Sequence, residues 1–186
     1  MVYTAGIKGS DWALCIGGFR AGAVGDVDRL LERVEGAVSP HLFQLFDADR
    51  VAGWEHLYFA AVNAVRASEA GSAVSKSLPI EVLLYASCQD QIKRAFDILG
   101  LSASTERVAL LVMADGAEEA ERAFERASSL IGTEDDTVLL VDDEKFKNLR
   151  RVYSVSDLEL EAVGGPKGAA LTRLLIERGA LLPVRR

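Results

Sequence analysis

Apolar residues in this chain alternate between short continuous runs and longer stretches with helical spacing. The run at residues 12–19 is nearly all apolar and has glycines near its end, which predicts a strand. Residues 26–37 repeat apolar positions at the spacing of a helix, and residues 41–46 form a second short apolar run. The pattern therefore predicts a strand, a helix and a strand at the beginning of the chain.

Residues 52–67 give the clearest helical pattern, with apolar side chains at the i, i+3, i+4, i+7 positions of one buried face. A stretch rich in glycine and serine, residues 71–77, then interrupts the pattern. Pro79 is expected in the first turn of the next helix, residues 80–86, because a missing N–H costs little there.

Ser87 is followed three residues later by Asp90, which fits the Ser-x-x-acid pattern of a helix N-terminus. We therefore predict a further helix after Ser87 that ends at Gly100. Its apolar stripe consists of Ile92, Ala95, Phe96 and Leu99.

The second half continues the alternation. Residues 108–114 predict a fully buried strand, and Asp115-Gly116 turns the chain into a helix with Glu118 and Arg122 paired on its outer face. Residues 137–141 are a further strand candidate. A helix is predicted over 142–153, and it carries the densest basic cluster, formed by Lys145, Lys147, Arg150 and Arg151. Gly164-Gly165-Pro166 then breaks the chain before a last helix.

Strands separated by helices predict an α/β (α+β) fold with a small central mixed or antiparallel sheet covered by helices. Spacing alone leaves the choice between a mixed and an antiparallel sheet open. Without a repeat or a long polar linker, we expect a single domain over residues 1–186.

The charge balance is 21 basic against 28 acidic residues, a net charge of -7, which disfavours broad attraction to nucleic acid or to anionic membranes. A local basic patch remains compatible with it. Cys15 and Cys88 are the only cysteines, so both are expected reduced, in a cytoplasmic protein. The apolar runs are far shorter than the ~20 residues of a membrane span, and residues 1–9 do not resemble a signal peptide.

The residues that usually carry catalysis are sparse. His41 and His56 are the only histidines, and with two distant cysteines they predict no metal site and no cofactor. Gly17-Gly18-Phe19 breaks the dinucleotide pattern, and Pro166 stands before Lys167 where a phosphate loop needs glycine. Since no serine-nucleophile motif occurs either, we expect the chain not to be an enzyme.

The stretch from residue 60 to residue 101 resembles the kinase-binding subunit of the KEOPS complex (also called EKC), the family that includes the PRPK-binding protein. The later segments EKFKNLRRVYSVSDLEL and LLIERGALL are similar to that family's closing third, whereas residues 1–50 contribute little. The residues that carry the resemblance in the first stretch are Asn63-Ala64, Ser77, Glu81, Leu83-Leu84, Ala86, Gln91-Ile92, Ala95 and Gly100.

The resemblance implies a subunit without chemistry of its own in a complex that makes threonylcarbamoyladenosine beside the tRNA anticodon. It implies binding to the small atypical kinase/ATPase subunit, as a heterodimer within a larger assembly, and to the single-stranded 3′ CCA end of tRNA. The alternatives are a stand-alone small-molecule-binding or enzymatic α/β domain, and a structural adaptor without RNA contact.

Four residues are candidates for the RNA site. Lys76, Lys93 and Arg94 supply charge for phosphates, and a helix beginning at Ser87 would direct N–H groups toward an anion. Alternatively, Lys93 and Arg94 only pair with the neighbouring Asp97 and Asp90. For the kinase we favour the last helix and its continuation, and ordinary core packing is the competing view; the candidates are Leu171, Leu174, Leu175, Leu181 and Leu182.

Overall fold

The computed structural model describes residues 2–184, which form two compact units, each built from two separate chain segments. The first unit combines the residues up to Ala48 with Gly100–Leu139, and the second combines Asp49–Leu99 with the residues from Leu140 onward. Within the described residues, no helix is both long and apolar enough to span a bilayer. The expectation of a single domain stays a prediction.

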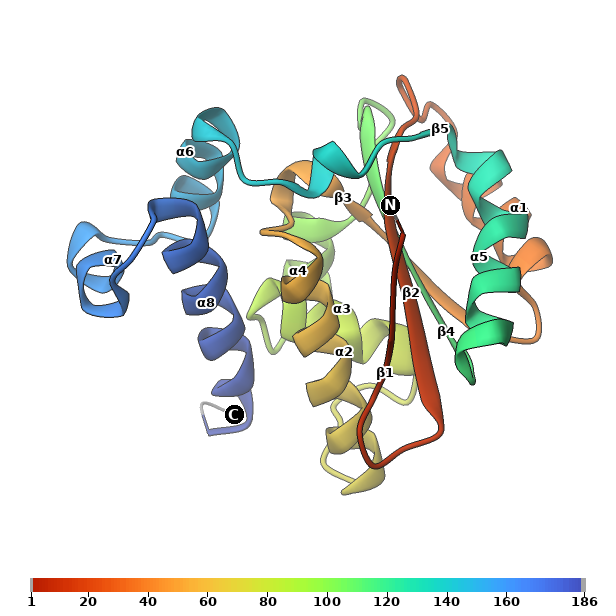
Figure 1. The fold of residues 1–186 in the computed structure, drawn as a ribbon, viewed down its shortest axis with the longest axis horizontal. Coiled ribbons are helices and arrows are strands. Elements are labelled where there is room, and N and C mark those ends of the chain that lie inside the picture. Colours follow the sequence, from red (N-terminus) through yellow and green to blue (C-terminus); the bar gives the residue numbers. More distant parts are fainter. Residues whose placement is uncertain (1, 185–186) are drawn as a thin grey trace. The chain divides into compact units, whose positions relative to one another are not determined.

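The first unit contains an antiparallel sheet in the order β1-β2-β4-β3, with a short fifth strand paired to β2 (Figure 1). The prediction of an α+β fold is therefore confirmed, and of the two sheet types left open the antiparallel one is found. Two helices, α1 and α5, lie side by side against the sheet. The elements are β1 (Tyr3–Gly6), β2 (Trp12–Arg20), α1 (Val27–Val38), β3 (Leu42–Asp47), β4 (Arg107–Asp115), α5 (Ala117–Ile131) and β5 (Thr133–Glu134).

The two central strands explain why this sheet is stable. β2 and β4 pair along their whole length, from Trp12 opposite Asp115 to Arg20 opposite Arg107, and their inner residues are buried. Gly17 lets α5 approach closely, because a Cβ there would lie 2.5 Å from Cζ of Phe124. The rings of Phe19 and Phe124 then pack with centroids 5.8 Å apart.

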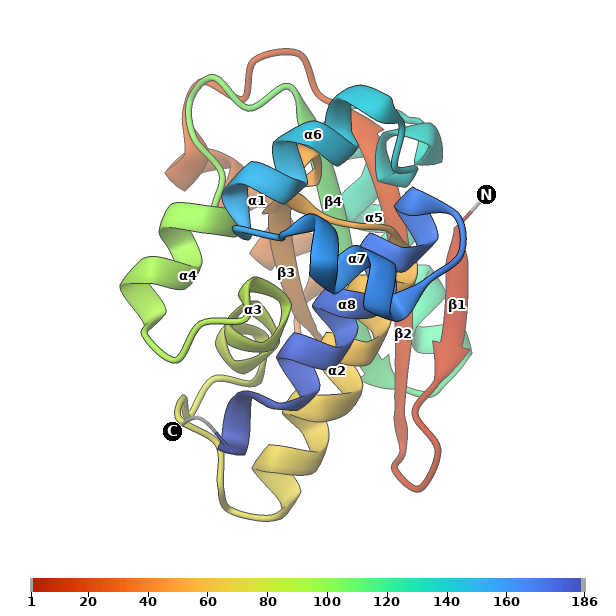
Figure 2. The ribbon, with the colours of Figure 1, turned by 90° about the vertical axis from the view of Figure 1, so that its left-hand side faces the viewer.

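The second unit is helical. Figure 2 shows α8 lying against α2, and α8 also packs against α3, α6 and α7. Its core includes Leu149 and Tyr153, and the Tyr153 hydroxyl donates a hydrogen bond of 3.0 Å to the carbonyl of Arg50. The helices are α2 (Trp54–Glu69), α3 (Leu78–Ser87), α4 (Ile92–Leu99), α6 (Asp143–Val152), α7 (Asp157–Val163) and α8 (Lys167–Ala180).

The strand predicted at residues 137–141 is wrong. Asp136–Leu139 forms a 3-10 turn that is held by the two aspartates at its start. Oδ1 of Asp136 accepts the Gly18 N–H at 2.8 Å, and Oδ1 of Asp135 accepts the Thr137 N–H at 3.0 Å. These side-chain hydrogen bonds favour the turn over pairing in a sheet. They outweigh the strand preference of the β-branched residues in this segment.

Candidate functional site

The predicted RNA-site lysine and arginine on α4 are both exposed. Nζ of Lys93 lies 3.0 Å from Oδ2 of Asp97, so the alternative ion pair is formed. The side chains of Lys93 and Asp97 are 86% and 60% exposed, so this ion pair contributes little to the stability of the fold. Arg94 forms no pair with Asp90 in the described part of the chain. Both cations are therefore accessible to a partner.

The helix N-terminus predicted at Ser87 is wrong. Ser87 is the last residue of α3, is fully buried, and its hydroxyl donates to the Leu84 carbonyl at 3.1 Å. Cys88 then adopts the left-handed conformation, with φ of 56°, and α4 begins only at Ile92. Since Ser87 is inside the unit, it cannot touch an RNA end while this packing persists.

The apolar stripe of α4 is only half buried. Ala95 and Leu99 are inaccessible as predicted, but Ile92 and Phe96 are 41% and 42% exposed. Lys93 precedes Phe96 by three residues and therefore lies on the same side of the helix. A cation and an exposed aromatic ring thus lie one turn apart on α4. The sequence prediction instead places Phe96 in the apolar stripe, on the face opposite Lys93 and Arg94.

Lys76 lies in a loop that a buried carboxylate anchors. Glu81 is fully buried, and its Oε2 accepts the N–H groups of Val74 at 3.0 Å and Ser75 at 2.8 Å. Lys76 follows directly and is exposed. The spacing between the loop and Glu81, one turn into α3, was the available signal for this anchor.

The candidate kinase-binding leucines mostly belong to the core of the second unit. Leu171, Leu174 and Leu175 pack inside it, and Leu182 is 2% exposed. Leu181 is the exposed one, at 42%. This burial supports the alternative of ordinary packing for the other four, because a partner cannot touch them in this arrangement.

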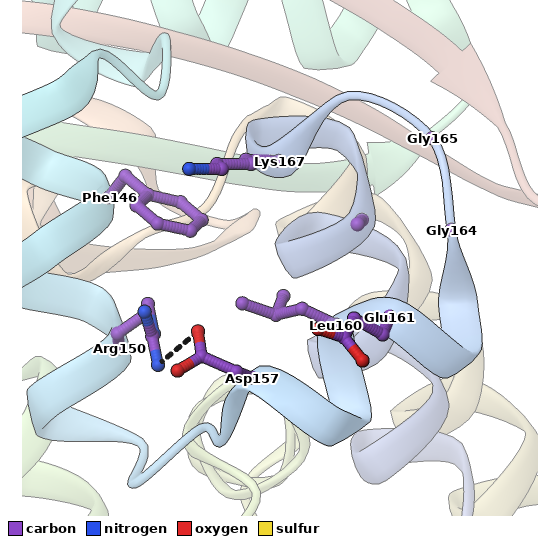
Figure 3. A pocket seen from close by; sticks show the side chains of 9 residues that line it. Phe146, Arg150, Asp157, Leu160, Glu161, Gly164, Gly165 and Lys167 are labelled. Carbon is purple, nitrogen blue, oxygen red and sulfur yellow. Dashed lines mark ion pairs between the residues drawn. The ribbon is translucent and has the colours of Figure 1, made fainter.

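A pocket of about 370 Å³ opens between α6, α7 and the beginning of α8 (Figure 3). The turn into α8 is made by Gly164 and Gly165, whose φ angles of 68° and 88° suit glycine, and Pro166 occupies the cap position. The lining residues are Phe146, Arg150, Asp157, Leu160, Glu161, Gly164, Gly165, Lys167 and Ala170.

Arg150 is held in place at one side of this pocket. Its guanidinium forms a 2.9 Å ion pair with Asp157 and donates from Nε to the Val155 carbonyl at 3.3 Å. The same group lies 5.9 Å from the centroid of the Phe146 ring. The predicted basic cluster is therefore divided, since Arg150 lines the pocket and Lys145 is buried; Lys147 and Arg151 remain exposed.

Two buried titratable side chains, Cys15 and His56, have strongly shifted pKa values. Burial raises the pKa of Cys15 to about 12, so its thiol stays protonated. Burial also lowers the pKa of His56 to about 4, and Nδ1 of this ring accepts the Ala52 N–H at 3.2 Å. Within residues 2–184, no group of three or more metal-ligating side chains comes together.

Comparison with known proteins places these features in a family. The family model described as kinase binding protein CGI-121 matches residues 24–181. The regulatory protein Cgi121 of Methanocaldococcus jannaschii is 32% identical over 114 residues, which cover 61% of this chain and 70% of that protein. These matches confirm the resemblance found in the sequence. The chain belongs to the CGI-121 family of kinase-binding proteins.

Proposed function

We propose that this protein is a non-catalytic regulatory subunit that binds the small atypical kinase/ATPase of the KEOPS complex in the cytoplasm. The family match over residues 24–181 carries this proposal. The protonated thiol of Cys15 and the neutral ring of His56 support a role without chemistry of its own. In this role the chain supports threonylcarbamoyladenosine modification of tRNA.

The kinase-binding role is tested by mixing the purified chain with the kinase/ATPase of the same host. Titration calorimetry should show a one-to-one complex, and size-exclusion chromatography should show a heterodimer. If the two proteins do not associate at any accessible concentration, the proposed role is wrong.

We further propose that the exposed side of α4 contacts the 3′ CCA end of tRNA. Single-stranded RNA is held by cations on its phosphates and by aromatic rings on which bases stack. Lys93, Arg94 and the exposed ring of Phe96 offer both on one helix, and Lys76 offers a fourth group on its anchored loop. The net charge of -7 makes binding by the isolated chain weak.

Gel-shift titrations with intact tRNA and with tRNA lacking its CCA end test this site. Replacing Lys93 and Arg94 by Glu, or Phe96 by Ala, should weaken binding to intact tRNA by about tenfold or more, because each removes a phosphate or stacking contact. The matched control reverses Lys147 and Arg151, which are exposed on α6. Equal losses in the control, or equal affinity for both tRNAs, would contradict the assignment.

The second candidate function is a small-molecule-binding domain, and the pocket of about 370 Å³ favours it. The two functions make different predictions. A ligand-binding domain should bind a metabolite in the absence of the kinase, and its pocket variants should leave the affinity for the kinase unchanged.

A further inference from the structure

The pocket between α6, α7 and α8 combines an apolar interior with a charged rim. Phe146, Leu160 and Ala170 supply the apolar walls, and Leu160 extends into the space between the helices in Figure 3. Around them lie two basic and two acidic side chains. An apolar centre surrounded by polar groups is typical of the anchor points of protein interfaces.

The rim charges indicate which kind of ligand fits. Arg150 and Asp157 neutralise each other in their ion pair. Lys167 and Glu161 are exposed, and neither forms an ion pair with another described residue. With two positive and two negative groups the lining is neutral, which gives a small anion such as a phosphate little advantage. A protein segment with an apolar side chain between charges of both signs matches it better.

The walls of the pocket are fixed before any partner arrives. Ser156 and Glu159 form a capping box at the start of α7, and Glu159 also pairs with Arg178 on α8. Arg178 donates in addition to the Tyr153 carbonyl at 2.6 Å. Since α7 is tied to α8 by the Glu159–Arg178 pair and to α6 by the Arg150–Asp157 pair, a partner would not have to order it, and little affinity would be lost to that cost.

We propose that this pocket is where the kinase docks, by inserting one apolar side chain between Phe146 and Leu160. The inserted residue is flanked by an acidic side chain that pairs with Lys167 and a basic side chain that pairs with Glu161. This inference rests on the proposed kinase-binding function and adds the surface that performs it. It assigns kinase binding to side chains that a partner can reach, in place of the buried leucines of α8.

Two leucines of α7 provide a matched test of the apolar contact. Leu160 lines the pocket, whereas Leu158 is 78% exposed and lies outside the lining. In calorimetric titrations with the kinase, Leu160→Arg should weaken binding by about tenfold or more, because it puts a charge into the apolar centre. Leu158→Arg should change the dissociation constant by about twofold at most, since it alters an exposed position outside the pocket.

A charge exchange at the rim keeps the net charge constant and does not depend on the folding of the leucine variants. Glu161→Lys combined with Lys167→Glu should weaken kinase binding by about tenfold and alter its salt dependence. The control is the same exchange at Glu144 and Lys147, which are exposed on α6 outside the lining. Circular dichroism and thermal unfolding confirm that each variant is folded.

The possible outcomes separate the two proposals. If the kinase binds the unaltered chain and the charge exchange at the pocket is no more harmful than its control, the docking site is elsewhere and this inference is wrong. Greater damage from Leu158→Arg than from a folded Leu160→Arg would overturn it as well. If the unaltered chain does not bind the kinase, the proposed function itself fails.

Discussion

At the scale of single residues, the structure shows which polar side chains are buried and hydrogen-bonded, which the composition of the chain does not reveal. Composition does not distinguish Glu81 from the other acidic residues, yet it is fully buried and accepts two backbone N–H groups. His56 lies on the buried face of α2, at 1% exposure. Its spacing places it beside the apolar stripe of the helix, which is compatible with a packed and with a surface position.

Burial of His56 makes stability depend on pH in the mildly acidic range. Its pKa is lowered from 6.5 to about 4 by burial and, to a smaller extent, by the charge of Lys145, against an opposing effect of the Ala86 backbone. The unfolded chain therefore binds the proton first, so stability is present above pH 6.5 and falls as the pH drops toward 4. Urea unfolding should show a loss of about 2 to 3 kcal/mol between pH 7 and pH 4.5.

The variant His56→Gln provides the control, since it removes the titrating ring. Its unfolding free energy should change much less over the same interval. The carboxylates Glu159 and Asp135, whose pKa values are lowered to about 2, lose their stabilisation only below their ordinary values of 4.5 and 3.8. An unchanged pH dependence in His56→Gln would show that another group is responsible.

Replacement of Glu81 tests the loop anchor. Glu81→Ala leaves the N–H groups of Val74 and Ser75 without their acceptor and should cost about 2 to 4 kcal/mol of unfolding free energy. Glu81→Gln keeps an acceptor oxygen in place and should cost less. Denaturant unfolding measures both variants, and a neutral effect of Glu81→Ala would contradict the anchoring role.

At the scale of elements, long periodic segments were predictable and short ones were not. The predicted strands near β2, β3 and β4 and the helices near α1, α2, α5 and α6 are confirmed. The strands β1 and β5 and the helix α7 were missed, because two to seven residues carry too little periodicity. For α7 a signal did exist, since Ser156 and Glu159 have the spacing of a capping box.

The candidate site was predictable only in part, because one of the elements that form it, α7, is too short to show a periodic pattern. Lys76, Lys93 and Arg94 are exposed as an RNA site requires, because their charge keeps them at the surface. The pocket depends on three elements that meet only after folding, and one of them is α7. No spacing in the sequence brings Phe146 and Leu160 together.

The half-buried stripe of α4 gives a prediction at this scale. Leu99→Ala should lower the unfolding free energy by about 2 to 4 kcal/mol, because Leu99 is fully buried. Ile92→Ser and Phe96→Ser should each cost much less, about 1 kcal/mol or below, since both side chains are partly exposed. Thermal or urea unfolding measures the difference, and equal costs would mean that Phe96 is a core residue.

At the scale of the whole molecule, net charge sets the conditions under which RNA binding can be seen. Three cations, Lys76, Lys93 and Arg94, are proposed to meet phosphates in a chain with a net charge of -7. For single strands, affinity falls with a logarithmic slope of about 0.7 per phosphate contact. The affinity for tRNA should therefore drop about 10- to 20-fold between 50 and 200 mM salt.

Reversing one of these cations should reduce that slope, whereas reversing Lys147 should leave it unchanged. Gel shifts or fluorescence anisotropy at several salt concentrations give the slopes directly. A slope that does not respond to any of the three cations would place the RNA on another surface.

The assembly of each unit from two distant chain segments has a consequence for synthesis on the ribosome. The second unit begins at Asp49, but α8, which packs on α2 and α3, is made about 80 residues after α3 ends. A nascent chain therefore exposes the apolar sides of α2 and α3 until α8 has been synthesised. We expect ribosome-stalled chains that end before α8 to be cut readily by protease within α2 and α3, and full-length chains to resist.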